Sequence, residues 1–173
     1  MRLAGQPWRG VCLVAVAGAV IALDQWTKSR AQVDFQPGAA HHVLGPISFL
    51  LTYNAGAAFS LGRGASPVIE AVAVALVAAV LWFSGRLARA GANPAIIVGF
   101  GLVSGGALSN LADRFIRHHH GAVVDFIQLV SWWPVFNVAD AAITIGALTI
   151  AAAMVGSSFG RPQPAPGADE GAG

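Results

Sequence analysis

The chain has 173 residues, of which 55% are hydrophobic and only 10% are Asp, Glu, Lys or Arg. Soluble domains carry about 25% charged residues, so this composition, with a mean hydropathy of +0.65, excludes a disordered chain and argues against a soluble nucleic-acid-binding protein. The single cysteine, Cys12, excludes an internal disulfide and a multi-cysteine metal site. The sequence therefore predicts an integral membrane protein.

Four stretches between charged residues are long enough to cross a bilayer, which requires roughly 20 helical residues. They predict membrane-spanning helices near residues 10–29, 66–85, 93–112 and 137–156. The first stretch has no small-residue cleavage site after its apolar part, so we expect a retained helix and not a signal peptide. The fold class expected is an all-α membrane protein.

The segments between the predicted helices are expected to lie outside the bilayer. Residues 30–65 contain an alternating run of apolar and polar side chains, which predicts a small β-like element on the membrane surface. Together with residues 113–136, this segment is expected to be extracytoplasmic. Residues 1–156 would form a single domain, and residues 157–173, rich in Pro, Gly and Ala, a disordered cytoplasmic tail.

Basic residues give the expected orientation. Each side of the predicted topology carries five Lys or Arg residues, but those near the N-terminus and in the short loop 86–92 weigh more than those in long loops. The sequence thus predicts that both termini are cytoplasmic.

Polar residues gather at one membrane face. Alternating helices place the end of the first and third spans and the start of the second and fourth on the same side. The polar residues at these places are Asp24, Gln25, Lys28, Asn54, Asn110, Asp113, Arg114, Asn137 and Asp140. Ionisable groups at membrane depth cost about 2.5–3.5 kcal/mol each on insertion scales, so such a cluster is a functional hypothesis by default. We expect a site near the extracytoplasmic face.

Two aspartates stand among apolar neighbours. Asp125 lies in the run GAVVDFIQ (121–128), which we expect to be extended, and Asp140 lies in VADAA (138–142). Two carboxylates close together in an apolar site cannot both ionise readily, so that one acts as base while the other holds a proton. The alternative is a pair of interfacial aspartates that only cap or solvate helix ends.

Five motifs, in this order, resemble those of the lipoprotein signal peptidases, or signal peptidase II. They are LDQWTK (23–28), NAGAAF (54–59), GGALSNLADR (105–114), VVDF (123–126) and FNVADAAI (136–143). The resemblance covers roughly residues 10–155. It implies an aspartic endopeptidase of the bacterial inner membrane that cleaves the signal peptide from prolipoproteins before a diacylglyceryl-modified cysteine.

The resemblance also implies roles for individual residues. Asp125 and Asp140 correspond to the catalytic pair, and the supporting residues are Asp24, Asn54, Asn110, Asp113, Arg114 and Asn137. Asp113 and Arg114 could instead form a salt bridge at the end of a helix. Asp24 and Lys28 could instead form an ion pair that only supports the fold. The family usually has Gly before the motif Asn, where this chain has Ser109, whose hydroxyl we expect to tighten packing or to bond the i−4 carbonyl.

The remaining expectations concern ligands and partners. The triplet His118–His120 cannot easily aim three imidazoles at one ion, so no metal is expected, and the chemistry needs no cofactor. The partners expected are lipidated prolipoproteins and membrane lipids, not nucleic acid, with the chain acting as a monomer. A small proton-coupled transporter is the alternative function, but transporters favour midplane ionisable groups and internal repeats, which this sequence lacks.

Overall fold

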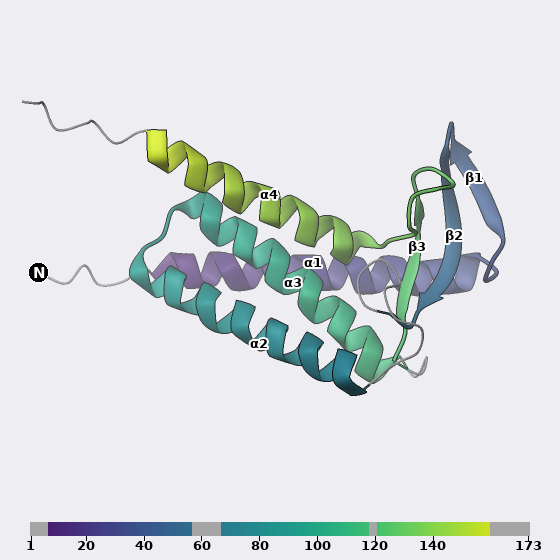
Figure 1. Cartoon of the computed structure of the whole chain (residues 1–173), viewed down its shortest axis with the longest axis horizontal. Helices are drawn as coiled ribbons and strands as arrows, with labels where there is room; N and C mark the ends of the chain where they lie inside the picture. The colour runs from purple at the N-terminus through teal and green to yellow at the C-terminus, as the bar shows by residue number, and fades with distance from the viewer. Residues whose placement is uncertain (1–6, 57–66, 118–120, 160–173) are drawn as a thin grey trace, which may run out of the picture.

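In the computed structural model, which describes residues 7–56, 67–117 and 121–159, long helices form a bundle with a small sheet at one end (Figure 1). The helices are α1 (Pro7–Asp34), α2 (Pro67–Ala90), α3 (Pro94–Ile116) and α4 (Val138–Phe159). Within the described residues, these four are long and apolar enough to cross a membrane. The predicted fold class, a four-span helical membrane protein, is confirmed.

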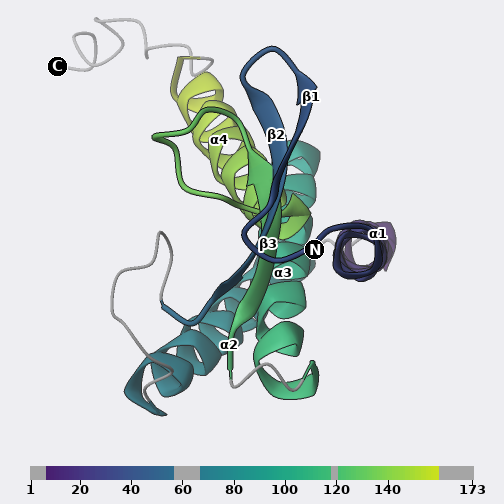
Figure 2. The same cartoon turned by 90° about the vertical axis from the view of Figure 1, so that its right-hand side faces the viewer.

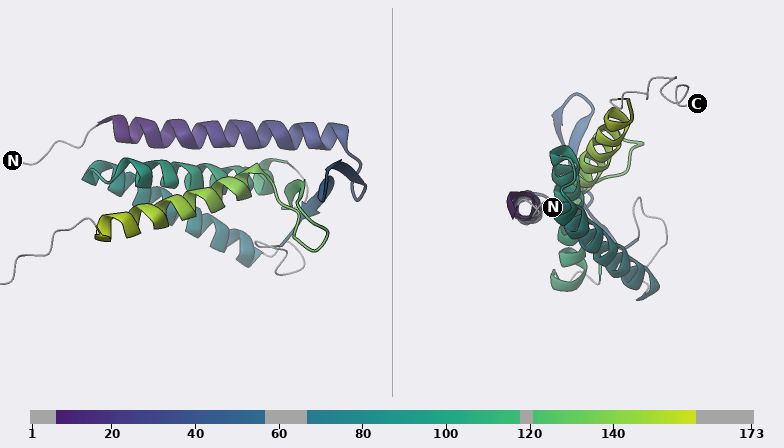
Figure 3. Two further views of the ribbon diagram at one scale, coloured as in Figure 1. Left: turned by 90° about the horizontal axis from the view of Figure 1, so that it is seen from above. Right: turned by 90° about the vertical axis from the view of Figure 1, so that its left-hand side faces the viewer.

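Helix α3 is the centre of the bundle, and α1, α2 and α4 all pack against it (Figure 3). Glycines allow this close approach. A Cβ atom on Gly105 would lie 2.7 Å from the Ala17 carbonyl oxygen of α1, and one on Gly106 would lie 2.5 Å from the Ala139 carbonyl oxygen of α4. The two adjacent glycines therefore let α3 contact both neighbouring backbones at the same level.

The sheet has three antiparallel strands in the order β1 (Ala40–Leu44), β2 (Ile47–Asn54) and β3 (Val123–Gln128). Gly45 takes a positive φ of 54° in the tight turn between β1 and β2. The third strand comes from the α3–α4 connection and pairs Thr52 with Asp125. The predicted β-like element is thus confirmed as a sheet, and it incorporates the extended segment around Asp125.

A small apolar core fixes the sheet to the bundle. Ala31 of α1 packs with Leu51, Val124 and Phe126 of the sheet, and all four are buried. Figure 2 looks onto this end of the molecule and shows β3 crossing the end of the helix bundle. Strand β3 is thereby held beside the ends of α1 and α3.

The helices run past the predicted crossings. Helix α1 ends at Asp34, where the predicted span ends near 29, and α3 ends at Ile116, where the predicted span ends near 112. Charge spacing marks where a helix leaves the bilayer, whereas backbone hydrogen bonding continues into the polar region. In the last turn of α1, for example, Arg30 and Asp34 form an exposed i,i+4 ion pair. Helix α4 likewise includes 157–159 of the predicted tail; residues 160–173 and 118–120 lie outside the described residues.

Candidate active site

Asp125 of β3 and Asp140 in the first turn of α4 line the same cavity, which has a volume of about 240 Å³. One wall of the cavity is apolar, with Val123, Phe136 and Ile143 among its residues. Polar groups from the β2 end and from α3 complete it: Asn54, Asn110, Arg114 and, from α4, Thr144. The structure therefore brings together the two aspartates that the sequence singled out, in surroundings that are part apolar and part polar.

Asn137 contacts both carboxyl groups. It is the residue before α4, where its side-chain oxygen accepts the backbone N–H of Asp140 at 2.9 Å, while its own backbone N–H donates to Asp140 Oδ2 at 3.2 Å. This reciprocal pair is a capping box, which fixes the first turn of α4. The Asn137 Nδ2 donates to Asp125 Oδ1 at 2.6 Å. One residue thus fixes the position of Asp140 relative to Asp125.

Two further asparagines complete the hydrogen bonding of the pair. Asn54 Nδ2 donates to Asp125 Oδ2 at 3.1 Å, and its Oδ1 accepts the Gly56 N–H, which fixes the orientation of the amide. Asn110 Nδ2 donates to Asp140 Oδ1 at 2.8 Å. Each of the four carboxyl oxygens therefore accepts an N–H.

Burial shifts the ionisation of Asp125, which is only 2% exposed. Removal from water disfavours the charged form, and the neighbouring Asp140 adds repulsion; together they raise the pKa of Asp125 from 3.8 to about 7. Hydrogen bonds from Asn54 and Asn137 and the charge of Lys28 act in the opposite direction. With this pKa, Asp125 can hold a proton or release it near neutral pH, as acid–base catalysis requires.

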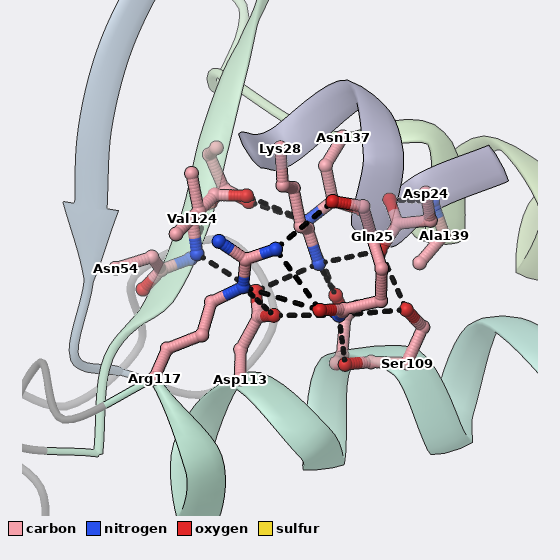
Figure 4. Close-up of polar contacts among 12 residues, drawn as sticks. Asp24, Gln25, Lys28, Asn54, Ser109, Asp113, Arg117, Val124, Asn137 and Ala139 are labelled. Atoms are coloured by element: carbon pink, nitrogen blue, oxygen red, sulfur yellow. Dashed lines mark hydrogen bonds and ion pairs between the residues drawn. The ribbon is translucent and has the colours of Figure 1, made fainter. Parts of the chain in front are cut away.

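Figure 4 shows a cluster of charged side chains from α1 and from the end of α3, made by Asp24, Lys28, Asp113 and Arg117. Lys28 Nζ is 2.7 Å from Asp24 Oδ2 and 2.8 Å from Asp113 Oδ2, and all three side chains are fully buried. Arg117 Nε lies 3.0 Å from Asp113 Oδ1. The predicted ion pair between Asp24 and Lys28 is present, whereas the alternative in which Asp113 pairs with Arg114 is wrong, because Asp113 pairs with Lys28 and Arg117.

The carboxylates of this cluster also hold the elements that carry the two aspartates. Asp24 Oδ1 accepts the backbone N–H of Ala139 at 2.8 Å, which ties α1 to the start of α4. Asp113 Oδ2 accepts the backbone N–H of Val124 at 3.1 Å, which ties α3 to β3. Each bond is made next to a site aspartate in the chain, so the cluster determines where Asp125 and Asp140 lie.

Arg114 reaches a different part of the site. Its guanidinium donates to the carbonyl oxygens of Gly121 at 2.8 Å and Gly56 at 2.6 Å, the residues just outside β3 and β2. It therefore joins the two strand ends at the cavity. This contact with two backbone carbonyls uses the planar, forked donor geometry of the guanidinium group.

Two residues of this region, Ser109 and Arg117, have contacts that the sequence does not predict. Ser109 Oγ donates to Asp24 Oδ2 at 2.7 Å, so the expected bond to the i−4 carbonyl is wrong. Arg117 also donates to Gln25 and Ser29 of α1. Its position four residues after Asp113 on one helix was the available signal.

Potential metal ligands are scattered over the part of the chain that the structure describes. There, no group of three or more His, Cys, Asp or Glu residues is placed to hold an ion. The triplet His118–His120 falls outside that part, and its expected lack of a metal stays a prediction.

Comparison with known proteins assigns the family. The family described as Signal peptidase (SPase) II matches residues 16–156. The chain belongs to the signal peptidase II family. It is 43% identical to the lipoprotein signal peptidase of Rhodococcus jostii over 146 residues, which cover 82% of this chain and 71% of that protein. It is 40% identical to that of Mycobacterium avium over 148 residues, covering 83% and 79%.

Solved structures agree with this assignment. One, described as a bacterial membrane enzyme, superimposes with a TM-score of 0.74 at 26% identity and covers 88% of this chain and 93% of its own. Another with the same description gives a TM-score of 0.70 at 28% identity, covering 83% and 92%. The predicted resemblance is confirmed: this signal peptidase II is a membrane peptidase, and the transporter alternative is not favoured.

Proposed function

We propose that this signal peptidase II cleaves the signal peptide from prolipoproteins, before the diacylglyceryl-modified cysteine, and that Asp125 and Asp140 are its catalytic pair. The observation that carries the proposal is the meeting of these carboxyl groups at one cavity, with Asn137 bonded to both. Each is held by asparagine N–H groups, which fix its position without competing for its proton.

The reaction follows from the protonation states of Asp125 and Asp140, one ionised and one protonated. The ionised aspartate takes a proton from a water molecule, whose oxygen attacks the carbonyl carbon before the lipidated cysteine. The protonated aspartate donates to the carbonyl oxygen. When the C–N bond breaks, the new amine of the cysteine takes a proton from the pair, and the signal peptide leaves as a carboxylic acid.

The cavity walls suit a lipidated peptide. The apolar side chains of Phe136 and Ile143 line the cavity, and one of them, Ile143, lies on the membrane-spanning helix α4. An apolar wall at this depth would hold a side chain or the lipid stem of the cysteine and align the scissile bond with the pair. Arg114, already bonded to two backbone carbonyls, lines the polar side, where we place the peptide backbone of the substrate.

The other predicted site residues act as supports. Asn54 and Asn137 hold Asp125, and Asn110 and Asn137 hold Asp140. Asp24 and Asp113 hold the backbones of α4 and β3.

We infer the membrane arrangement from the two ends of the bundle. The start of α1 and the end of α4 lie at the end opposite the sheet (Figure 1). With the basic-residue bias, this supports cytoplasmic termini and a site near the extracytoplasmic face of the bacterial inner membrane. Exposed apolar side chains such as Val14, Leu76 and Leu148 would contact lipid. We also propose that the chain acts as a monomer.

The test uses the purified full chain in detergent. It is incubated with a prolipoprotein peptide that carries diacylglyceryl on its cysteine and with the same peptide lacking the lipid, and mass spectrometry locates the cut. We expect cleavage directly before the lipidated cysteine, far slower cleavage of the unlipidated peptide, and none by the double variant D125N/D140N. Cleavage by the double variant, or proton flux in vesicles without cleavage, would contradict the proposal.

A further inference from the structure

The amide of Asn110 lies between a buried cation and Asp140. Lys28 Nζ donates to Asn110 Oδ1 at 2.8 Å, and Asn110 Nδ2 donates to Asp140 Oδ1 at 2.8 Å. Lys28 comes from α1, Asn110 from α3 and Asp140 from α4, so this chain of contacts crosses the bundle. It connects the charged cluster to one carboxyl group of the pair.

The ammonium group fixes which way the amide points. An ammonium has donors and no acceptor, so the oxygen of Asn110 must face Lys28 and its NH₂ must face Asp140. With the opposite orientation, an amide oxygen would face a carboxylate oxygen, and an NH₂ would face an ammonium. Both contacts would be repulsive, so Lys28 selects the orientation that supports an ionised Asp140.

Without Lys28, Asn137 would hold the side-chain amide of Asn110 less well. Its Nδ2 has two hydrogens and three acceptors within reach: Asp125 Oδ1 at 2.6 Å, Asn110 Oδ1 at 3.1 Å and the Val124 carbonyl oxygen at 3.2 Å. Only two of these bonds can form well at once. Because Lys28 satisfies the oxygen of Asn110, Asn137 remains available to Asp125 and to the β3 backbone.

The charges around Asp140 come from three elements. They are Asp24 and Lys28 on α1, Asp113 and Arg114 on α3 with Arg117 at its C-cap, and Asp125 on β3. Within the cluster, two carboxylates oppose two cations, and Arg114 is directed at backbone carbonyls. Asp140 lies in the first turn of α4, where the helix dipole and the capping N–H favour an anion. Asp125 lies on a strand and has no helix N-terminus of its own.

We propose that Lys28 is a positioning residue of the catalytic pair: through Asn110 it places the negative charge on Asp140 and leaves the shared proton on Asp125. The inference rests on the proposed function of the pair. Asp140 then activates the water, and Asp125 donates to the carbonyl oxygen of the substrate.

The test compares two Met variants that each remove one cation from the same cluster. Lys28→Met loses the contact with Asn110, whereas Arg117→Met loses a bond to Asp113 and leaves Asn110 untouched. For K28M we expect kcat to fall about 10- to 100-fold with little change in KM, as for other partners that orient a reacting group. The acid limb of kcat/KM should move to higher pH by about one unit, because a cation near the anion is lost.

R117M should lower kcat by less than K28M does and should leave the acid limb in place, because Lys28 and its contact with Asn110 remain. Its thermal unfolding temperature falls, because the bond to Asp113 is lost. If K28M keeps the wild-type profile, or if both variants shift it equally, the positioning role is overturned. All assays use the full chain and the diacylglyceryl-modified peptide.

A second comparison keeps the test decisive if K28M does not fold. The variant K28M/D24N has a charge-balanced cluster, and its reference is D24N. We expect its kcat to lie at least about ten-fold below that of D24N at equal KM, because the Asn110 amide is no longer fixed. Equal kcat values would mean that Lys28 only balances Asp24, which overturns the inference. If these kcat values are equal and D140N is inactive, the proposed function of the pair still holds. An active D140N would overturn the proposed function itself.

Discussion

Three asparagines determine how the pair of carboxyl groups is held. Asn54, Asn110 and Asn137 each direct an amide N–H at Asp125 or Asp140, and each amide oxygen has its own donor in Gly56, Lys28 or the Asp140 backbone. Amides neither gain nor lose protons at neutral pH. They therefore fix the geometry of the pair and leave the titration to the two aspartates.

Burial of Asp125 predicts a specific pH dependence of stability. Its pKa of about 7 in the folded protein lies above the 3.8 of an unperturbed carboxyl, so between these values the folded state holds a proton that the unfolded chain has released. Its contribution to the free energy of unfolding is therefore fully present below pH 3.8 and is lost as the pH rises through about 7. Asp125→Asn removes this contribution.

Thermal unfolding of the wild type and D125N in detergent between about pH 4 and 8 measures the effect. The unfolding temperature of D125N relative to the wild type should rise with pH across this range and level off above about pH 7.5. A constant difference would mean that Asp125 does not change its protonation within the range.

Residue types and motif spacing predicted the pair and its polar neighbours, because ionisable groups in apolar spans are conspicuous. The partners inside the cluster were less predictable. Arg117 lies beyond the predicted end of its span, and the direction of the Ser109 hydroxyl depends on how close α1 approaches α3. Both depend on the tertiary arrangement and not on local sequence.

At the scale of elements, the contact between α3 and α4 positions Asp140. Gly106 lies against the backbone of Ala139, the residue directly before Asp140, and leaves no room for a side chain. Gly18 of α1, in contrast, has open space where a Cβ atom would be. The two glycines form a matched pair for testing whether close packing matters.

Gly106→Ala should destabilise the protein by about 1–3 kcal/mol, the usual cost of overpacking, and should lower kcat because the start of α4 is displaced. Gly18→Ala should leave activity unchanged and stability equal or slightly higher, since Ala is the better helix former. Unfolding temperatures and cleavage rates of the two variants check this. Equal stability of G106A and the wild type would contradict the packing described.

The elements themselves differ in how far the sequence predicts them. Charge spacing identified four spans because a bilayer requires about 20 apolar residues regardless of tertiary contacts. The alternation within residues 30–65 indicates strands, and the run GAVVDFIQ (121–128) indicates an extended segment. The pairing of β2 with β3, which places Thr52 opposite Asp125, joins segments far apart in the chain and has no local signal.

At the scale of the whole molecule, the two ends of the helix bundle differ in their chemistry. The sheet lies at one end of the bundle, and the α2–α3 turn lies at the other (Figure 1). The site and the charged cluster lie at the sheet end, because Asp125 belongs to β3 and Asp113 of the cluster is bonded to Val124 of the same strand. For a signal peptidase II with cytoplasmic termini, the sheet would face the extracytoplasmic side.

Single-cysteine labelling tests the orientation. Cys12 is replaced by Ser, and a new cysteine is placed at Val43 in β1 or at Ala90 at the end of α2, both exposed. In intact spheroplasts, a membrane-impermeant maleimide should label V43C, whereas A90C should react only after lysis. The reverse pattern would place the site on the cytoplasmic side.

The most direct measurement of the central claim is single-turnover cleavage of the diacylglyceryl-modified peptide by D125N and by D140N separately. Each variant retains the shape of its side chain and lacks an ionisable carboxyl, so folding can be verified by its unfolding temperature and by circular dichroism. We predict that each single variant loses at least about 10³-fold in rate, since water activation and protonation both fail. Cleavage within a few-fold of the wild-type rate by either folded variant would contradict the two-carboxylate account.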